Sequence, residues 1–295
     1  MPMPAEQLRL DLGHLTLAAQ AWGSPELPPI LLLHGWLDNS ATFVHVAPQL
    51  AAAGYYVVAL DLPGHGLSDH RAVGCGYWLW DYVSDVLLAA DRLGFTQFTL
   101  AGHSMGGIIG VLLSASLPER VQRLLLIDGL LPYTAEADEA PQKLADFLRA
   151  QEALGGKRKP VYPERELAVK ARMQGVGSIT YEAAEHLCER GLEAVEGGFT
   201  WRSDARLTLP SPLRLSRAHA LAFVQRIEAP TLLLLAEQGM LLTPLKQQLE
   251  TVLAGTHIEH HNLPGGHHLH LDSAEGGQLV VEQMLKFLAK NESLP

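Results

Sequence analysis

The stretch Leu100-Ala101-Gly102-His103-Ser104-Met105-Gly106-Gly107 places a serine inside a G-x-S-x-G pattern. The apolar run before the serine is typical of the end of a buried strand, and the run after it is typical of a helix. Glycine two residues to either side allows a sharp turn where a larger side chain would collide with neighbouring elements. The pattern predicts that Ser104 occupies a strained, exposed strand-to-helix turn, where a serine commonly serves as a nucleophile.

Short apolar runs alternate with segments of helical texture along most of the chain. The runs are nearly continuous, as in a parallel sheet that is covered on both faces. They comprise residues 29–33, 56–60, 98–101, 124–127, 231–235 and 258–263. Helical segments are expected at residues 42–53, 77–93, 105–116 and 243–253, and a hairpin at 8–22. The alternation predicts an α/β fold with a mostly parallel, doubly wound sheet.

The alternation breaks between residues 131 and 216. That segment is charged and helical in texture at 138–154, 163–173 and 181–195, and it holds no strand of the buried type. The strand-and-helix pattern resumes at Ala229-Pro230. We therefore expect residues 1–130 and 217–295 to form one α/β core, and residues 131–216 to be a helical cap inserted into it.

Composition excludes several classes of protein. A chain of 295 residues with 47% hydrophobic content can bury one large core. Its net charge of −10 argues against partners such as nucleic acid or an anionic membrane. The first residues lack the pattern of a signal peptide, and two cysteines make no disulfide framework. We expect a cytoplasmic protein, monomeric or homodimeric, without a membrane partner.

A nucleophilic serine needs a histidine as its base, and four histidines compete. They follow the last apolar run: His261, His267, His268 and His270. His267 comes directly after the pair Gly265-Gly266, at the tip of a loop that could carry an imidazole across the top of the sheet, so we choose it. A zinc site made by these histidines is the rival interpretation, but no cysteine or paired carboxylate motif completes it, so no metal is expected.

Two carboxylates compete to orient that imidazole. Asp128 and Glu237 each follow an apolar run, at the sheet edge where ligands of open α/β sheets bind. Asp128 has the shorter side chain and a glycine beside it. Its alternative role is that of a turn or helix-cap residue.

The sequence also contains candidates for an oxyanion hole. His34-Gly35-Trp36 follows the run 29–33, and Gly35 allows the chain to bend so that the Trp36 N–H points at the site. The Met105 N–H would be the second donor, and two such donors would stabilise the charge of a tetrahedral intermediate. The alternative is a plain turn between strand and helix. His34 itself is expected to bond to loop backbone.

Four ordered motifs together resemble the α/β-hydrolase superfamily across the entire chain. They are His34-Gly35-Trp36, Asp61-Leu62-Pro63-Gly64-His65-Gly66-Leu67-Ser68, Gly102-His103-Ser104-Met105-Gly106 and Gly266-His267. The chain is most similar to the serine hydrolase-like proteins, through residues 34–39, Leu126-Ile127-Asp128 and Phe199-Thr200-Trp201-Arg202-Ser203-Asp204. The resemblance implies that Ser104 is the nucleophile and His267 the base, with residues 61–68 as a structural loop.

One position departs from the family pattern. Many relatives carry an aspartate two residues after the glutamate that follows the penultimate strand of the core, and here that position is Gly239. Some members take the acid from the preceding strand, where Asp128 stands. We therefore prefer Asp128 as the acid, with Glu237 second and a pair without an acid third.

The favoured function is a serine hydrolase that cleaves a small carboxylic ester or related acyl compound, without a cofactor. Hydrolysis of a carbon–carbon bond is a second possibility within the same fold. A binding protein that kept the fold and lost turnover is the alternative from another class, because fold alone does not fix function.

Overall fold

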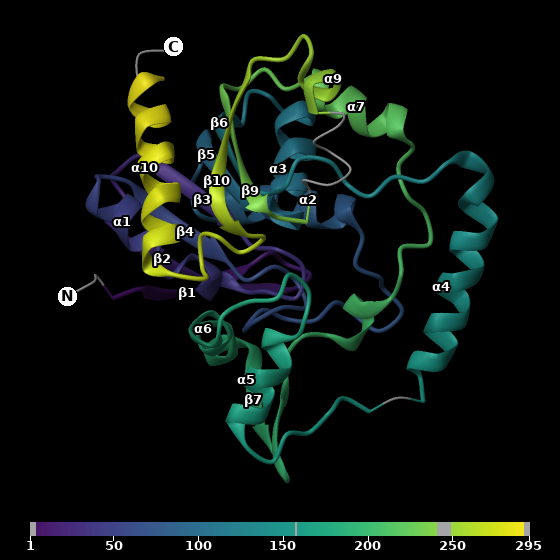
Figure 1. Ribbon diagram of the computed structural model, residues 1–295. Helices are drawn as coiled ribbons and strands as arrows, with labels where there is room; N and C mark the ends of the chain where they lie inside the picture. The colour runs from purple at the N-terminus through teal and green to yellow at the C-terminus, as the bar shows by residue number, and fades with distance from the viewer. Residues whose placement is uncertain (1–3, 157, 241–248, 292–295) are drawn as a thin grey trace.

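The structure is a computed structural model, and it describes residues 4–156, 158–240 and 249–291. An eight-stranded sheet runs through its centre (Figure 1). In spatial order, its strands are β1 (Glu6–Asp11), β2 (Thr16–Trp22), β4 (Tyr56–Leu60), β3 (Pro29–Leu33), β5 (Phe98–His103), β6 (Val121–Ile127), β9 (Thr231–Gln238) and β10 (Ile258–Gly266). The first two pairings are antiparallel and all the others are parallel.

Helices cover both faces of this sheet. Side chains of α2 (Leu79–Arg92), α3 (Met105–Ser116), α7 (Arg217–Gln225) and α9 (Leu249–Leu253) join the apolar core of one face. The helices α1 (Ala47–Ala52) and α10 (Ala274–Lys290) contribute to the core of the other. Alternate residues of the central strands point into each core, which explains why those strands read as continuous apolar runs. The doubly wound α/β fold is confirmed.

Some predicted boundaries were wrong. One helix was expected over residues 42–53, but the structure has a 3₁₀ turn, η1 (Ser40–Phe43), followed by the short α1. Pro48 explains the break, because proline is accepted in the first turn of a helix and not in its interior. The helix expected over 243–253 is described only from Leu249, and the rest of it lies outside the described residues.

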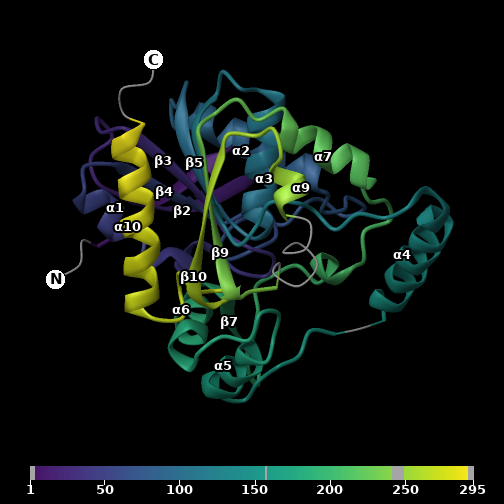
Figure 2. The same ribbon diagram turned by 45° about the horizontal axis from the view of Figure 1, so that its top comes forward.

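Residues 131–216 lie outside the large sheet. They form the 3₁₀ turns η2 (Ala137–Glu139) and η3 (Ala205–Thr208), the helices α4 (Ala140–Leu154), α5 (Arg165–Met173) and α6 (Tyr181–Gly191), and the hairpin of β7 (Leu192–Val195) and β8 (Gly198–Trp201). Figure 2 shows α6 and β7 beyond the carboxyl-terminal ends of β9 and β10. We propose that this segment is the cap and that residues 1–130 and 217–295 form the core.

The hairpin is a correction to the sequence analysis, which extended a helix to residue 195. The helix ends at Gly191, and β7 pairs with β8 from Leu192 opposite Trp201. Gly197 and Gly198 have φ of 86° and 140°, which suits a tight turn that few other residues adopt. A glycine pair before Phe199 and Thr200 was therefore a usable signal for a hairpin.

The turn between β5 and α3 positions Ser104. This serine has φ of 51° and ψ of −115°, a conformation that costs a non-glycine residue about 1–3 kcal/mol. The two flanking glycines are required by close backbone approach. A Cβ on Gly102 would lie 2.3 Å from the carbonyl carbon of Gly106, and one on Gly106 would lie 2.1 Å from the carbonyl oxygen of Leu33.

Replacement of Gly106 by alanine should therefore destabilise the protein strongly. We expect Gly106→Ala to cost about 3 kcal/mol or more in free energy of unfolding, because the contact is with backbone that cannot rotate away. Urea unfolding would measure this. Gly156→Ala is the control, since a Cβ there meets nothing within 4 Å, and it should stay within about 0.5 kcal/mol of the wild type. Equal losses for the two variants would contradict the steric argument.

Candidate active site

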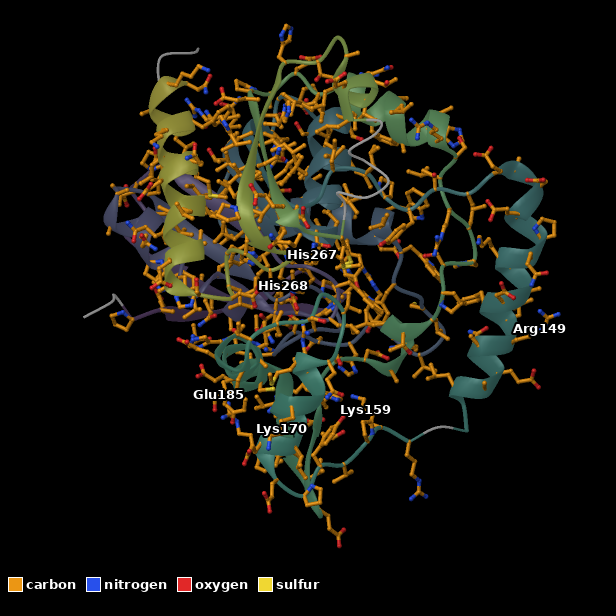
Figure 3. The ribbon with its side chains drawn as sticks, viewed as in Figure 1. Arg149, Lys159, Lys170, Glu185, His267 and His268 are labelled. Carbon is orange, nitrogen blue, oxygen red and sulfur yellow. The ribbon has the colours of Figure 1, made fainter. Side chains whose placement is uncertain are left out.

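The structure brings Ser104, His267 and Asp128 into one hydrogen-bonded chain. His267 directly follows β10, and its Nε2 lies 3.0 Å from the Oγ of Ser104. The Nδ1 of the same ring lies 2.6 Å from Oδ2 of Asp128. A ring with its proton on Nδ1 donates to the carboxylate and can accept the serine proton at Nε2. Figure 3 shows His267 near the centre of the molecule, between the sheet and the helices α5 and α6.

Asp128 is held rigidly at the end of β6. Its side chain is fully buried, and its backbone has φ of 45°. Its N–H donates to the carbonyl of Leu234 at 2.7 Å, and its Oδ1 accepts from the N–H of Ala236 at 3.1 Å. Both partners belong to β9, so the neighbouring strand fixes this carboxylate from two sides.

The departure at residue 239 has a direct structural counterpart. A Cβ on Gly239 would lie 2.4 Å from Oδ2 of Asp128. The carboxylate of Asp128 thus fills the volume that a side chain at 239 would need. Glu237, the other candidate acid, is exposed at the end of β9. The structure brings Asp128 to the imidazole, and it does not bring Glu237 there.

The other histidines of the late cluster separate from one another. His261 pairs with Glu259 at 3.0 Å and is partly exposed. His270 is buried, with its Nε2 2.9 Å from the hydroxyl of Thr42, and burial holds its pKa well below the usual value. His268 turns toward Asp38, with Nε2 3.1 Å from Oδ2. The zinc site that rivalled the triad in the sequence therefore does not assemble from these four rings.

His34 and the loop of residues 61–68 have the structural roles that the sequence analysis expected. His34 donates from Nδ1 to the carbonyl of Gly35 at 2.7 Å and accepts from the Leu62 N–H at 2.9 Å. Burial lowers the pKa of His34, so its ring is neutral. Asp61 accepts from the N–H groups of Ser40 and Leu67 at 2.7 and 2.8 Å, which makes its loop a structural one.

A cavity of about 570 Å³ opens above Ser104. Trp36 and Met105, the predicted donors of the oxyanion hole, line it together with Ser104 and His267. Met105 is the first residue of α3, so its N–H has no partner within the helix. The Trp36 indole donates to the carbonyl of Leu207 at 2.9 Å, which ties this loop to η3.

Sequence reasoning missed a buried polar group beside the triad. Asp38 lies two residues after the motif His34-Gly35-Trp36, and its side chain is buried, with 3% exposed. Its Oδ1 accepts from Nη2 of Arg172, in α5, at 2.6 Å, while its Oδ2 accepts from His268. Burial alone would raise the pKa of Asp38, but His268 and Arg172 hold it well below the usual value. The one local signal was an aspartate three residues after His34-Gly35.

Two groups of described residues could ligate a metal ion. One is the buried set of Asp38, His103 and His268, which lines the cavity. The other lies near the surface and comprises His45, Glu182 and His186. His103, the residue before Ser104, is fully buried, and burial lowers its pKa to about 4.

Comparison with known proteins shows the family of the chain. A family model described as the α/β hydrolase fold matches residues 28–154. A serine hydrolase-like protein of Dictyostelium discoideum is 30% identical, over 98% of this chain and 83% of that protein. The chain belongs to the α/β-hydrolase fold family. Within it, the chain is one of the serine hydrolase-like proteins, which confirms the resemblance and supports a hydrolase.

Solved structures agree as well. A hypothetical protein of Pseudomonas aeruginosa PAO1 superposes with a TM-score of 0.92 at 57% identity, covering 96% of this chain and 99% of that one. The thioesterase domain from the curacin biosynthetic pathway has a TM-score of 0.79 at 28% identity, covering 94% and 99%. In the described part of the chain no helix is long and apolar enough to cross a membrane. Cys75 and Cys188 are both free thiols.

The choice between the two acids is testable by matched substitutions. We expect Asp128→Asn to lower kcat by roughly 10⁴, because the amide no longer favours the useful tautomer or supports the imidazolium. Glu237→Gln, at an exposed position, should leave kcat within about twofold of the wild type. Steady-state hydrolysis of an activated ester by both variants would measure this. A dead Glu237→Gln enzyme beside an active Asp128→Asn enzyme would reverse the assignment.

The geometry at Gly239 also predicts that the acid can be moved to the neighbouring strand. Asp128→Gly removes the carboxylate and suits the positive φ at that position. Adding Gly239→Asp should place a carboxylate in nearly the same volume and recover about tenfold or more of the lost kcat. Gly239→Asp alone should be destabilised, because two carboxylates would share one space. No recovery in a folded double variant would contradict the spatial equivalence.

Proposed function

We propose that this protein is a serine hydrolase that cleaves a small carboxylic ester or related acyl compound through an acyl-enzyme on Ser104. The observation that carries the proposal is the continuous chain from Ser104 through His267 to Asp128, at 3.0 and 2.6 Å, on the wall of a cavity. The three side chains have the chemical types and the order of contacts that nucleophilic catalysis requires.

The reaction would proceed in two halves. Ser104 attacks the carbonyl carbon while His267 takes the hydroxyl proton at Nε2, and the proton then passes to the leaving group. Water attacks the acyl-enzyme in the second half, with His267 acting again as base. Asp128 keeps the Nδ1 proton in place and stabilises the imidazolium that forms twice in each turnover.

Two backbone N–H groups would stabilise the oxyanion. Met105 contributes one from the start of α3, where the helix dipole also favours negative charge. Trp36 contributes the other, from the turn after β3. Support comes from the fact that both residues line the cavity beside Ser104. The indole bond to Leu207 holds the Trp36 loop in position.

The cavity favours a substrate with an apolar portion. Its wall is rich in aromatic and aliphatic residues from the start of α2 and the two residues before it, from the start of the proposed cap, and from η3 and the segment after it: Tyr77, Trp78, Leu79, Trp80, Leu131, Tyr133, Leu207, Leu209 and Leu213. Such a wall gains free energy by burying apolar surface of about the size of a small acyl group. The similar solved structure that is named a thioesterase domain supports acyl transfer as the reaction class.

Reaction with a fluorophosphonate probe separates the enzyme from a binding protein that has lost turnover. We expect the wild type to be labelled on Ser104, and Ser104→Ala to be unlabelled, folded and inactive toward ester substrates, with kcat lowered by up to about 10⁶. Absence of labelling in the wild type, or ester hydrolysis by Ser104→Ala at the wild-type rate, would refute the proposal. Hydrolysis of carbon–carbon substrates with no ester turnover would favour the second enzyme class.

The expected location and assembly remain predictions. We propose a cytoplasmic protein, monomeric or homodimeric. The buried Cys188 and exposed Cys75, both unpaired, are compatible with a reducing compartment.

A further inference from the structure

Three polar atoms from separate parts of the chain converge beside the triad. They are Oδ2 of Asp38, Nδ1 of His103 and Nε2 of His268, and all lie within 4.8 Å of one another. The carboxylate oxygen is 3.1 Å from the His268 nitrogen and 3.6 Å from the His103 nitrogen. All three side chains are buried, none more than 3% exposed, yet each residue also lines the cavity above Ser104.

The tautomer of His103 leaves one nitrogen without a partner. Its Nε2 lies 2.9 Å from the carbonyl oxygen of His267, and a carbonyl can only accept, so Nε2 carries the proton. Nδ1 of the neutral ring then presents a lone pair toward the carboxylate of Asp38, which offers no proton. This Nδ1 is a buried nitrogen without a hydrogen bond in the described part of the chain. Burial of a polar atom without a partner is costly, and such atoms are rare in folded proteins.

A divalent metal ion would satisfy that atom by displacing the proton that Nε2 of His268 donates to Asp38, and the His268 ring would then carry its proton on Nδ1. Two ligand atoms on one tetrahedral zinc, each about 2.0–2.1 Å from the metal, lie about 3.3–3.4 Å apart. The two distances from Oδ2 of Asp38, 3.1 and 3.6 Å, bracket that value. The hydrogen bond from Nε2 of His103 to the carbonyl of His267 also fits a metal ligand. Metal-binding histidines usually donate their other N–H to a carbonyl or carboxylate.

We propose that Asp38, His103 and His268 form a binding site for a divalent transition-metal ion such as Zn²⁺, with its fourth position open to the cavity. Imidazole nitrogen and carboxylate oxygen are ligands that zinc commonly takes, and three protein ligands leave one position for water or another small ligand. This set shares only His268 with the histidine cluster that the sequence suggested.

Because of Arg172, the ion should bind reversibly and should not be needed for folding. Its guanidinium is 2.6 Å from Oδ1 of Asp38, so the carboxylate is already neutralised without an ion. The protein therefore folds without the metal, in contrast to domains whose structural zinc supplies folding energy. The nearby positive charge also weakens cation binding. We expect zinc to act as an inhibitor that is released by chelation.

Occupancy should slow the proposed ester hydrolysis, and this consequence rests on the proposed function. The ring centroids of His103 and His268 lie 4.6 and 5.2 Å from that of His267. An ion held by these two rings would direct its fourth ligand into the cavity above Ser104, in space that a substrate needs. The metal site and the proposed ester hydrolysis can be tested separately, because metal binding can be measured without turnover.

The binding experiment uses the full-length protein after treatment with EDTA and desalting. Titration with Zn²⁺ by calorimetry, and with Co²⁺ by visible absorption, reports stoichiometry, affinity and coordination number. We expect the wild type to bind one ion at this site, and Asp38→Asn, His103→Gln and His268→Gln each to weaken it by about tenfold or more. With three ligand variants, the site can still be tested if one of them fails to fold.

Two control variants test whether zinc binds at these three residues and not elsewhere. His186→Gln removes the group of His45, Glu182 and His186 near the surface, and should leave the buried site intact. Asp61→Asn changes another fully buried carboxylate that pairs with an arginine, Arg190 at 2.8 Å, but that does not belong to the metal-ligand set. We expect this variant to bind zinc as the wild type does. That result would show that loss of a buried ion pair does not by itself weaken zinc binding.

The outcomes decide the proposal. Zinc binding that is lost in the three ligand variants and kept in both controls supports it. No binding by the wild type, unchanged binding in folded ligand variants, or loss only in His186→Gln overturns it. If the wild type hydrolyses esters, zinc should inhibit it and EDTA should restore the rate, with no inhibition in His268→Gln. A wild type without ester turnover that still binds zinc refutes the proposed function alone.

Discussion

The backbone turn at Ser104 is the constraint on which the rest of the site depends. It forces a serine to φ of 51° between a strand and a helix, and the packing around it allows no side chain on Gly102 or Gly106. The backbone of Ser104 is also covered from the end of β6, since a Cβ on Gly129 would lie 2.4 Å from its carbonyl oxygen. Close packing of neighbouring strands thus maintains a conformation that costs about 1–3 kcal/mol.

The contact between Asp128 and His267 decides what can stand at position 239. The carboxylate of Asp128 reaches the imidazole from the end of β6, and the residue after β9 lies against that carboxylate, so the two positions compete for one space. Only one can be filled, because a Cβ at Gly239 would lie 2.4 Å from the carboxylate of Asp128. Glycine at 239 is therefore the partner of an aspartate at 128, rather than evidence of a lost triad.

The sequence predicted what local patterns encode. Glycine spacing predicted the turn at Ser104, and apolar runs predicted the sheet. The glycine pair before His267 singled out one of four histidines, the one that the structure places beside Ser104. The bond between Arg172 and Asp38 was missed because its partners are 134 residues apart and share no pattern. The break at Pro48 was missed although its cause is visible in the sequence.

The central claim is that an acyl group passes through Ser104, and trapping that group tests it most directly. Acid quenching during the first turnover of an activated ester, followed by peptide mass mapping, would locate the adduct. We expect the mass of one acyl group on the peptide that contains Ser104, formed before the second product appears. Product release with no adduct on that peptide, or an adduct on Cys75 alone, would contradict the account.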